Sequence, residues 1–136
     1  MDSLTKKIVA KIKDCHDIDF KIMREVEHHK LLEIMSSIDI LICPSRDDPM
    51  PIVCTEAMML SKPVIVSTHT GTASFIHDGI NGFVFDSGNS KQLADSIVKA
   101  VNNSHLLPDM GKRARKIYEE YFTLEQIDKN VKQIFA

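Results

Sequence analysis

The sequence lacks several features that mark particular classes of protein. It has no apolar segment near the roughly 18 residues of a membrane-spanning helix, and its N-terminus lacks the apolar core of a signal peptide. Its 17 lysines and arginines stand against 19 acids, and this net charge of −2 gives no sign of nucleic-acid binding. Its three cysteines, at positions 15, 43 and 54, form neither a metal-binding spacing nor an even set for disulfides. We therefore expect a cytoplasmic protein in a reducing compartment.

Length and composition indicate one domain. The 136 residues suffice for a sizeable core but not for two ordinary domains, and 43% hydrophobic residues is typical of a globular chain. The sequence contains no internal repeat, low-complexity tract or linker. We expect a single domain over residues 1–136.

Segments typical of strands and helices alternate along the chain. Short apolar runs predict strands at 20–23, 39–42, 64–67 and 83–85. Helical spacing of apolar residues predicts helices at 4–12, 28–37, 52–60, 90–101 and 108–121, a helical turn at 73–76 and a last helix after Thr123. A residue typical of helix caps, Asn89 or Ser90, starts the helix at 90–101. The last helix starts with a capping-box pattern, Thr123 followed by Gln126. This alternation predicts an α/β fold with a parallel sheet that is covered on both faces.

The apolar residues also predict which helix faces pack inward. The expected inward residues are Ile52, Val53, Ala57, Met59 and Leu60 in the helix at 52–60, and Leu93, Ala94, Ile97 and Val101 in the helix at 90–101. The last helix is lined by Ile127, Val131, Ile134 and Phe135.

A strand, a loop and a helix follow one another between residues 39 and 60, and acids occupy the loop and the helix. Asp48 lies in the proline-containing loop, and Glu56 lies in the body of the helix. A second polar loop, 68–72, follows the next predicted strand and contains Gly71. In open parallel sheets, ligands bind where loops leave the carboxyl ends of the strands. We therefore expect Asp48, the helix start at Ile52 and the loop around Gly71 to meet at one edge of the sheet.

These residues resemble the signature of the retaining family-4 glycosyltransferases of GT-B architecture. In that family an acid, seven further residues and Glu-Ala-Met precede a Pro-Val strand; here the pattern reads Asp48, Glu56-Ala57-Met58 and Pro63-Val64. The family's first acid is usually Glu, whereas this chain has Asp48. The resemblance continues through Gly71 and the run Asp78-Gly79-Ile80-Asn81-Gly82-Phe83-Val84. It implies a Rossmann-like parallel sheet flanked by helices, the C-terminal donor-binding half of a GT-B glycosyltransferase without its first strands.

The resemblance implies roles for the residues of this site. Glu56 would accept hydrogen bonds from the ribose of a nucleotide diphosphate sugar, and Asp48, the catalytic candidate, from hydroxyls of the donor sugar. Backbone N–H groups of Met50 and Ile52 would bind the diphosphate. Pro49 and Pro51 depart from the family pattern, because proline has no N–H. The other donor-binding candidates are Ser45, Pro51, Thr70 and Gly71. The nucleotide sugar is the substrate, and the resembled family uses no metal or other cofactor.

The resemblance also implies that parts of the family's enzyme fall outside this sequence. Two strands before the equivalent of 20–23 carry the basic pair that neutralises the diphosphate, and an acceptor-binding domain precedes them. Stabilising the charge of a departing group is usually the largest catalytic effect. We therefore expect no transferase activity from this chain alone. We also expect a partner that supplies the missing acceptor domain or a complementary chain, and self-association through an open sheet edge.

Other interpretations stay open at this point. The same fold could serve as a non-catalytic binding or assembly module. A receiver-like signalling domain would need a further Asp after a later strand, whereas the strand at 64–67 ends in Ser67-Thr68. Two pairs of residues have side chains of the kind that bind metals, His28 with His29 and Asp47 with Asp48. Adjacent side chains on a helix diverge, and the resembled family works without a metal, so we expect no metal site.

Overall fold

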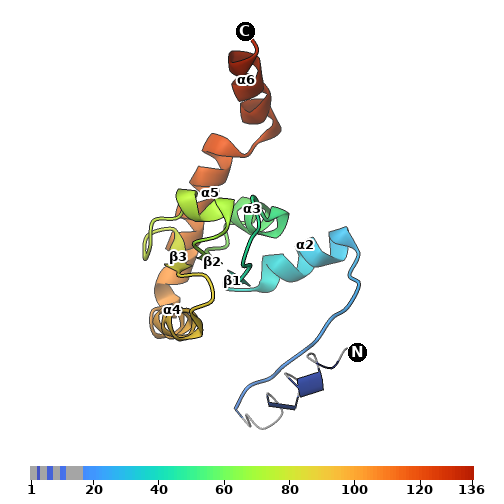
Figure 1. Cartoon of the computed structure of the whole chain (residues 1–136), viewed down its shortest axis with the longest axis vertical. Helices are drawn as coiled ribbons and strands as arrows, with labels where there is room; N and C mark the ends of the chain where they lie inside the picture. The colour runs from blue at the N-terminus through green and yellow to red at the C-terminus, as the bar shows by residue number, and fades with distance from the viewer. Residues whose placement is uncertain (1–2, 4–5, 8–9, 12–16) are drawn as a thin grey trace.

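The computed structural model describes residue 3 and residues 6–7, 10–11 and 17–136. The helix predicted at 4–12 lies largely outside the described residues. From residue 17 onward the chain runs through an extended segment into a layered body, and its last helix extends beyond that body (Figure 1).

Three parallel strands form the sheet at the centre of this body. β1 (Leu41–Cys43) pairs with β2 (Val64–Ser67), and β2 pairs with β3 (Gly82–Phe85). The register places Ile42 beside Ile65 and Ile65 beside Phe83. The strands predicted at 39–42, 64–67 and 83–85 are therefore confirmed, with a two-residue difference at the start of β1. The parallel α/β fold is confirmed with them.

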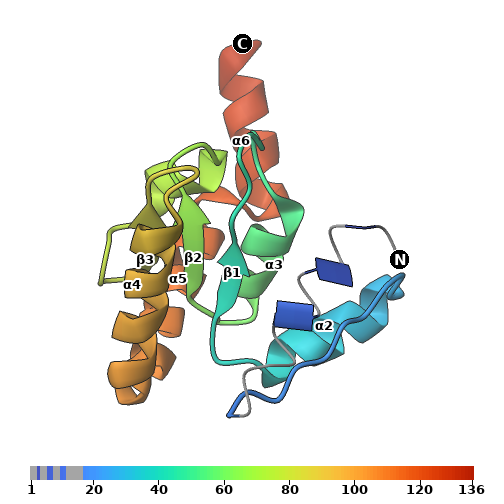
Figure 2. The ribbon, with the colours of Figure 1, turned by 60° about the horizontal axis from the view of Figure 1, so that its bottom comes forward.

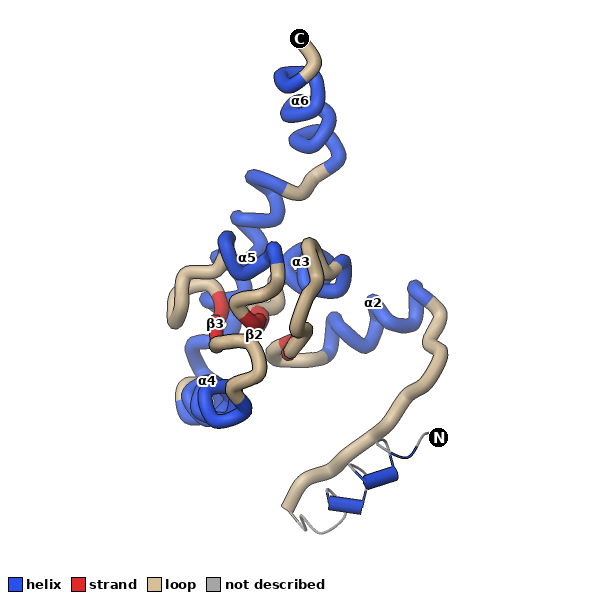
Figure 3. The backbone as a smooth tube through the Cα atoms, viewed as in Figure 1, coloured by secondary structure: helices blue, strands red, loops and turns tan. Residues whose placement is uncertain are grey.

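Helices cover both faces of the sheet. α3 (Ile52–Met59) and α4 (Ser90–Asn102) lie on opposite sides of the strands, which Figure 3 shows between them. α2 (His28–Ser37) lies on the α3 side, and α5 (Leu107–Tyr121) passes the end of the sheet and packs along α3 (Figure 2). The remaining elements are two 3₁₀ helices, η1 (Gly71–Phe75) and η2 (Ser104–Leu106), and the last helix, α6 (Leu124–Ile134). The expected helices from residue 28 onward are thus present.

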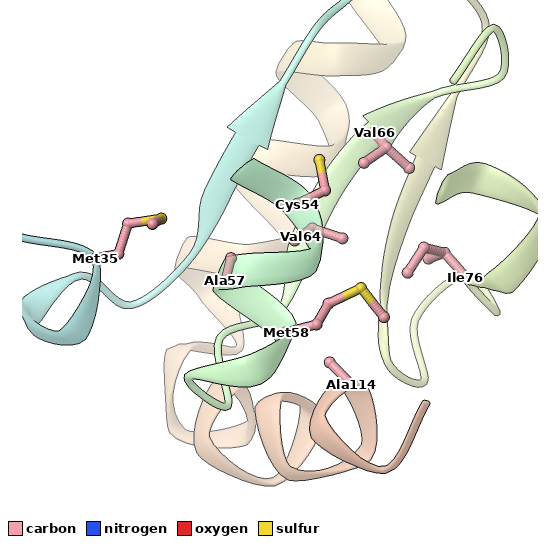
Figure 4. Close-up of a cluster of buried hydrophobic side chains, with 8 residues drawn as sticks. All are labelled: Met35, Cys54, Ala57, Met58, Val64, Val66, Ile76 and Ala114. Atoms are coloured by element: carbon pink, nitrogen blue, oxygen red, sulfur yellow. The ribbon is translucent and has the colours of Figure 1, made fainter. Parts of the chain in front are cut away.

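The core lies on both faces of β2, because its side chains alternate between two apolar clusters. Val64 and Val66 belong to the cluster on the α3 side, together with Met35, Cys54, Ala57, Met58, Ile76 and Ala114 (Figure 4). Ile65 points the other way and packs with Phe83, Phe85, Ala100, Leu107 and Met110. Burying a side chain of this size contributes roughly 1.5–3 kcal/mol. β2 therefore joins the two helical layers and fixes the position of the loops at its carboxyl end.

The two predicted helix caps form as expected. The Oδ1 atom of Asn89 accepts the backbone N–H of Gln92 at 3.0 Å, at the start of α4. The hydroxyl oxygen of Thr123 accepts the backbone N–H of Gln126 at 3.3 Å, at the start of α6. Each bond satisfies one N–H that the first turn of a helix leaves unpaired.

The strand predicted at 20–23 is wrong. Residues 18–24 have no regular secondary structure and form the long loop that leads to α2 (Figure 3). Phe20, Ile22 and Met23 are exposed, and no strand among the described residues lies beside them. An isolated extended segment leaves its backbone groups without partners, so the apolar pattern alone does not make a strand.

The predicted inward faces are only partly correct. In α3 the buried residues are Cys54, Ala57 and Met58, whereas Ile52 is 72% exposed. In α4 the inward stripe runs through Leu93, Ile97 and Ala100, and Ala94 and Val101 are exposed. The apolar residues of α6 are all exposed, up to 86% at Leu124, and Phe135, just after the helix, is 84% exposed. This helix projects beyond the sheet, so no described part of the chain covers its face (Figure 1).

Candidate functional site

Two loops meet at the carboxyl edge of the sheet. The first, residues 44–51, connects β1 to α3, and the second, residues 68–70, connects β2 to η1. The backbone N–H of Asp48 donates to the carbonyl of His69 at 3.2 Å, and the N–H of Gly71 donates to the carbonyl of Asp48 at 3.1 Å. Asp48 and Thr70 thus form an isolated parallel bridge. The structure brings together Asp48, Thr70, Gly71 and the start of α3, as the sequence predicts.

Gly71 allows the two loops to approach this closely. A Cβ atom at this position would lie 1.6 Å from the carbonyl oxygen of Pro49, which is far inside any van der Waals contact. The backbone of one loop therefore occupies the space of the missing side chain. The glycine is required by this close approach and not by a left-handed backbone conformation.

Buried hydroxyl groups join the floor of the site to the strands. The hydroxyl of Ser67, at the end of β2, donates to the carbonyl of Ser45, at the start of the first loop. The hydroxyl of Thr70 donates to the carbonyl of Ser67 at 2.9 Å, and that of Thr72 lies 3.6 Å from the sulfur of Met50. A buried polar group without a partner costs free energy, and within the described part of the chain no buried side-chain nitrogen or oxygen lacks one. The floor is therefore fixed before any ligand binds.

The carboxylate of Asp48 is half-buried and bonds within its own loop. Its Oδ1 atom accepts the backbone N–H of Met50 at 3.1 Å. The family resemblance implies that this N–H binds a diphosphate; in the structure without a ligand, it donates to Asp48. Pro51 stands at the cap of α3 without a side-chain cap bond. The first turn of the helix is therefore where backbone N–H groups and the positive end of the helix dipole face the loop.

Glu56 lies one helical turn after Ile52, and a histidine from another helix holds its carboxylate. The Nε2 atom of His28, the first residue of α2, contacts Oε1 of Glu56 as a hydrogen bond and ion pair. The Glu56 side chain is 15% exposed and that of His28 is 67% exposed. The contact joins residues 28 positions apart on separate helices, so no spacing in the sequence signals it. The sequence interpretation did not predict this contact.

Cys54, in the helix that starts at the site, is buried. Burial of Cys54 in the core under α3, and its closeness to Cys43, raise the pKa of its thiol far above the ordinary range. A neutral thiol is a poor nucleophile and a poor metal ligand. Among the residues that the structure describes, no group of three or more His, Cys, Asp or Glu side chains could hold a metal ion. His28 contacts Glu56, and His29 lies 3.4 Å from Glu27, so the two histidines serve different partners.

The site therefore combines acceptors of hydrogen bonds with a helix start. One carboxylate lies in the loop, a second lies one turn inside the helix, and the first turn of α3 lies between them. Carboxylates bind hydroxyl groups, and helix starts bind anions. None of the helices in the described part of the chain is long and apolar enough to span a membrane.

Comparison with known proteins identifies related sequences and folds. The family described as "Glycosyl transferases group 1" matches residues 6–117. An uncharacterized glycosyltransferase of Methanocaldococcus jannaschii is 25% identical over 126 residues, which cover 86% of this chain and 36% of that protein. The N-acetyl-alpha-D-glucosaminyl L-malate synthase of Bacillus anthracis is 24% identical over 94% of this chain and 33% of its own length. The chain thus spans about a third of the length of these two relatives.

Solved structures share the fold. Sucrose-phosphate synthase of Thermosynechococcus elongatus superimposes with a TM-score of 0.79 at 21% identity, over 96% of this chain and 34% of its own. Anabaena HepE in complex with UDP superimposes with a TM-score of 0.78 at 21% identity, over 96% of this chain and 36% of its own.

Proposed function

The chain belongs to the glycosyl transferases group 1 family, and on that premise we propose that it is the donor-binding part of a retaining enzyme. The reaction moves a sugar, of the hexose class, from a nucleotide diphosphate sugar to an acceptor. The observation that carries this proposal is the meeting of the Asp48 loop and the Gly71 loop at the carboxyl edge of a parallel sheet, where α3 begins with Glu56 one turn inside it.

Each part of the donor has a matching group at this edge. The ribose hydroxyls donate to the carboxylate of Glu56, and the hydroxyls of the sugar donate to Asp48, the proposed catalytic residue. The diphosphate lies at the start of α3, where Ile52 is exposed and the helix dipole favours negative charge. Ser45, Pro51, Thr70 and Gly71 form the surrounding wall and floor, and no metal or other cofactor is needed.

Release of the N–H of Met50 is the adjustment that donor binding requires. Asp48 accepts this N–H in the free chain, so a diphosphate has to compete with an intramolecular carboxylate for it. Pro49 and Pro51 offer no N–H on either side. We therefore place the diphosphate mainly on the first turn of α3, and we expect weaker binding than in a site with a glycine-containing loop.

We propose that transfer also uses cationic groups from outside residues 1–136. A departing diphosphate carries negative charge, and its stabilisation by cationic groups is usually a large catalytic effect. The proposed enzyme obtains these groups and its acceptor site from a further domain or a complementary chain. Residues 1–136 are then one partial nucleotide-sugar-binding domain that has no transferase activity by itself. A cytoplasmic location stays a prediction from the sequence.

The outer edge of β1 is where we propose that a further strand or a second copy pairs. In the described part of the chain β1 has a neighbouring strand on one side only. A groove of about 310 Å³ lies beside it, lined mainly by Ile40, Ile42, Ile65, Ile97, Ala100 and Leu107. Unpaired strand edges favour association. We therefore expect the purified chain to self-associate when no complementary chain is present.

The test is calorimetric titration of the purified chain with uridine and guanosine diphosphates, for the wild type and Glu56→Ala. A hydrogen bond to a charged group contributes roughly 1.5–3 kcal/mol, so we expect Glu56→Ala to weaken binding about ten- to a hundredfold. Glu33→Ala is the matched control, because Glu33 is an exposed helical acid whose Oε2 atom pairs with Nζ of Lys30 at 2.8 Å. Unchanged affinity together with a lowered melting temperature would make Glu56 a structural residue.

A non-catalytic binding module of the same fold is the second candidate. The structure of the loop favours this candidate. Pro49 and Pro51 have no N–H, and the N–H of Met50 already donates to Asp48, so three backbone donors are missing from the diphosphate site. Addition of the missing domain or chain separates the two functions. Turnover of a nucleotide sugar in the reconstituted assembly supports the enzyme, and an assembly that forms without turnover supports the module.

A further inference from the structure

The contact between His28 and Glu56 leaves one carboxylate oxygen open. His28 contacts Oε1 of Glu56, and no hydrogen bond to Oε2 comes from the residues that the structure describes. A carboxylate can accept several hydrogen bonds across its two oxygens. Glu56 can therefore keep His28 on one oxygen and receive a ligand hydroxyl on the other.

His28 limits the freedom of the Glu56 side chain. A glutamate has three rotatable side-chain bonds, and fixing them when a ligand binds costs conformational entropy. His28 stands at the start of a ten-residue helix, and its imidazole holds the carboxylate from a second element. A side chain that is already held has less freedom to lose, so the ligand binds more tightly.

We propose that His28 is a positioning residue for the nucleoside end of the donor: it holds Glu56 so that Oε2 faces the ribose diol. This inference rests on the proposed function of Glu56. It assigns His28 no direct contact with the diphosphate or with the sugar that is transferred.

The neighbouring histidine shows what an ordinary surface pair looks like in this helix. His29 lies 3.4 Å from Glu27, and the side chains are 72% and 82% exposed. Pairs of this kind contribute little, because solvent screens them and both side chains lose freedom. Glu56, in contrast, is largely covered and lies in the helix that starts at the site. His29 is therefore a matched control for His28.

The experiment measures binding of two probes, UDP and inorganic pyrophosphate, to the full chain by calorimetry. The variants are His28→Ala, His28→Gln, His29→Ala, Glu56→Gln and the double variant His28→Ala with Glu56→Gln. We expect His28→Ala to weaken the binding of UDP roughly two- to fivefold. The affinity for pyrophosphate should not change, because pyrophosphate has no ribose. We expect His28→Gln, which keeps an N–H donor, to restore part of the loss, and His29→Ala to behave as the wild type. In the Glu56→Gln background, loss of His28 has no further effect.

Two results would overturn the inference while the proposed function stands. If His28→Ala weakened the binding of UDP and of pyrophosphate equally, His28 would be a general structural residue. Unchanged or tighter UDP binding would show that His28 does not prepare Glu56 for the ribose. A wild type that does not bind UDP, or an unchanged UDP affinity in Glu56→Gln, would instead refute the proposed function and with it this inference.

Discussion

Two regions of the molecule are built in opposite ways. The closed region, the loops at 44–51 and 68–70 with α3 behind them, has paired backbone groups, bonded hydroxyls and a buried apolar cluster beneath it. The open region, residues 18–23, the outer edge of β1 and α6, has exposed apolar side chains and, among the described residues, an unpaired strand edge. Contacts among its own residues thus hold the closed region in place. The open region has the features of surfaces that another strand or domain covers.

Removing one apolar side chain from each region gives the largest expected contrast. Met58 is fully buried in the cluster behind α3, and Leu124 of α6 is 86% exposed. We expect Met58→Ala to lower the free energy of unfolding by about 3–4 kcal/mol, because it leaves a cavity. Leu124→Ala should change it by less than about 0.5 kcal/mol. Urea denaturation measures both, and a comparable loss for Leu124→Ala would show that α6 is covered in solution.

Filling the space at Gly71 tests how closely the closed region is packed. A methyl group there meets the carbonyl of Pro49, so the two loops have to separate. We expect Gly71→Ala to cost about 2–3 kcal/mol and to weaken UDP binding. Gly88→Ala is the control: its φ of +81° strains any side chain, but no atom lies within 4 Å of the added Cβ. It should lower stability by about 1 kcal/mol and leave UDP binding unchanged, and equal UDP affinities in the two variants would contradict the site geometry.

Raising the pH tests the buried thiol of the closed region. The pKa of Cys54 is raised by burial above its ordinary value of 9.0. Above about pH 9 the thiol ionises in the unfolded chain but stays protonated in the folded chain, so stability falls as the pH rises. The largest slope for one such group is about 1.4 kcal/mol per pH unit. We expect unfolding measurements at pH 8 and pH 10 to give a smaller loss in Cys54→Ala than in the wild type. Equal losses would place Cys54 in contact with solvent.

A charge on the outer edge of β1 has the smallest expected effect on stability and a distinct effect on association. Ile42 is 38% exposed and lines the apolar groove beside this edge. We expect Ile42→Lys to change the free energy of unfolding by less than about 0.5 kcal/mol and to shift the chain toward the monomer, because edge lysines oppose strand pairing. Light scattering measures the mass. Val98→Lys, at an exposed position of α4, should leave self-association intact, and a wild type that is monomeric would refute the edge proposal.

Local pattern predicted several helices, strands and caps well. The helix at 28–37 and the strand at 64–67 agree with the structure at both ends, since their apolar spacing and their flanking residues act over a few positions. The caps at Asn89 and Thr123 form for the same reason. Loops that leave neighbouring parallel strands must meet at one edge, so the approach of Asp48 to Gly71 also followed from the order of elements.

The sequence by itself determined the alternation of elements and the edge at which the candidate site lies. Only the tertiary structure decided that residues 20–23 form no strand, that α6 is uncovered and that Asp48 takes the N–H of Met50. It also decided that His28 holds Glu56, across 28 positions of sequence. The physical reason is the range of the interactions. Helix spacing and capping act between near neighbours in the sequence. A strand needs a partner strand, an apolar face needs a packed element over it, and a buried carboxylate needs a hydrogen-bond donor. Such partners can come from distant positions in the sequence, so only the packed chain decides where they lie.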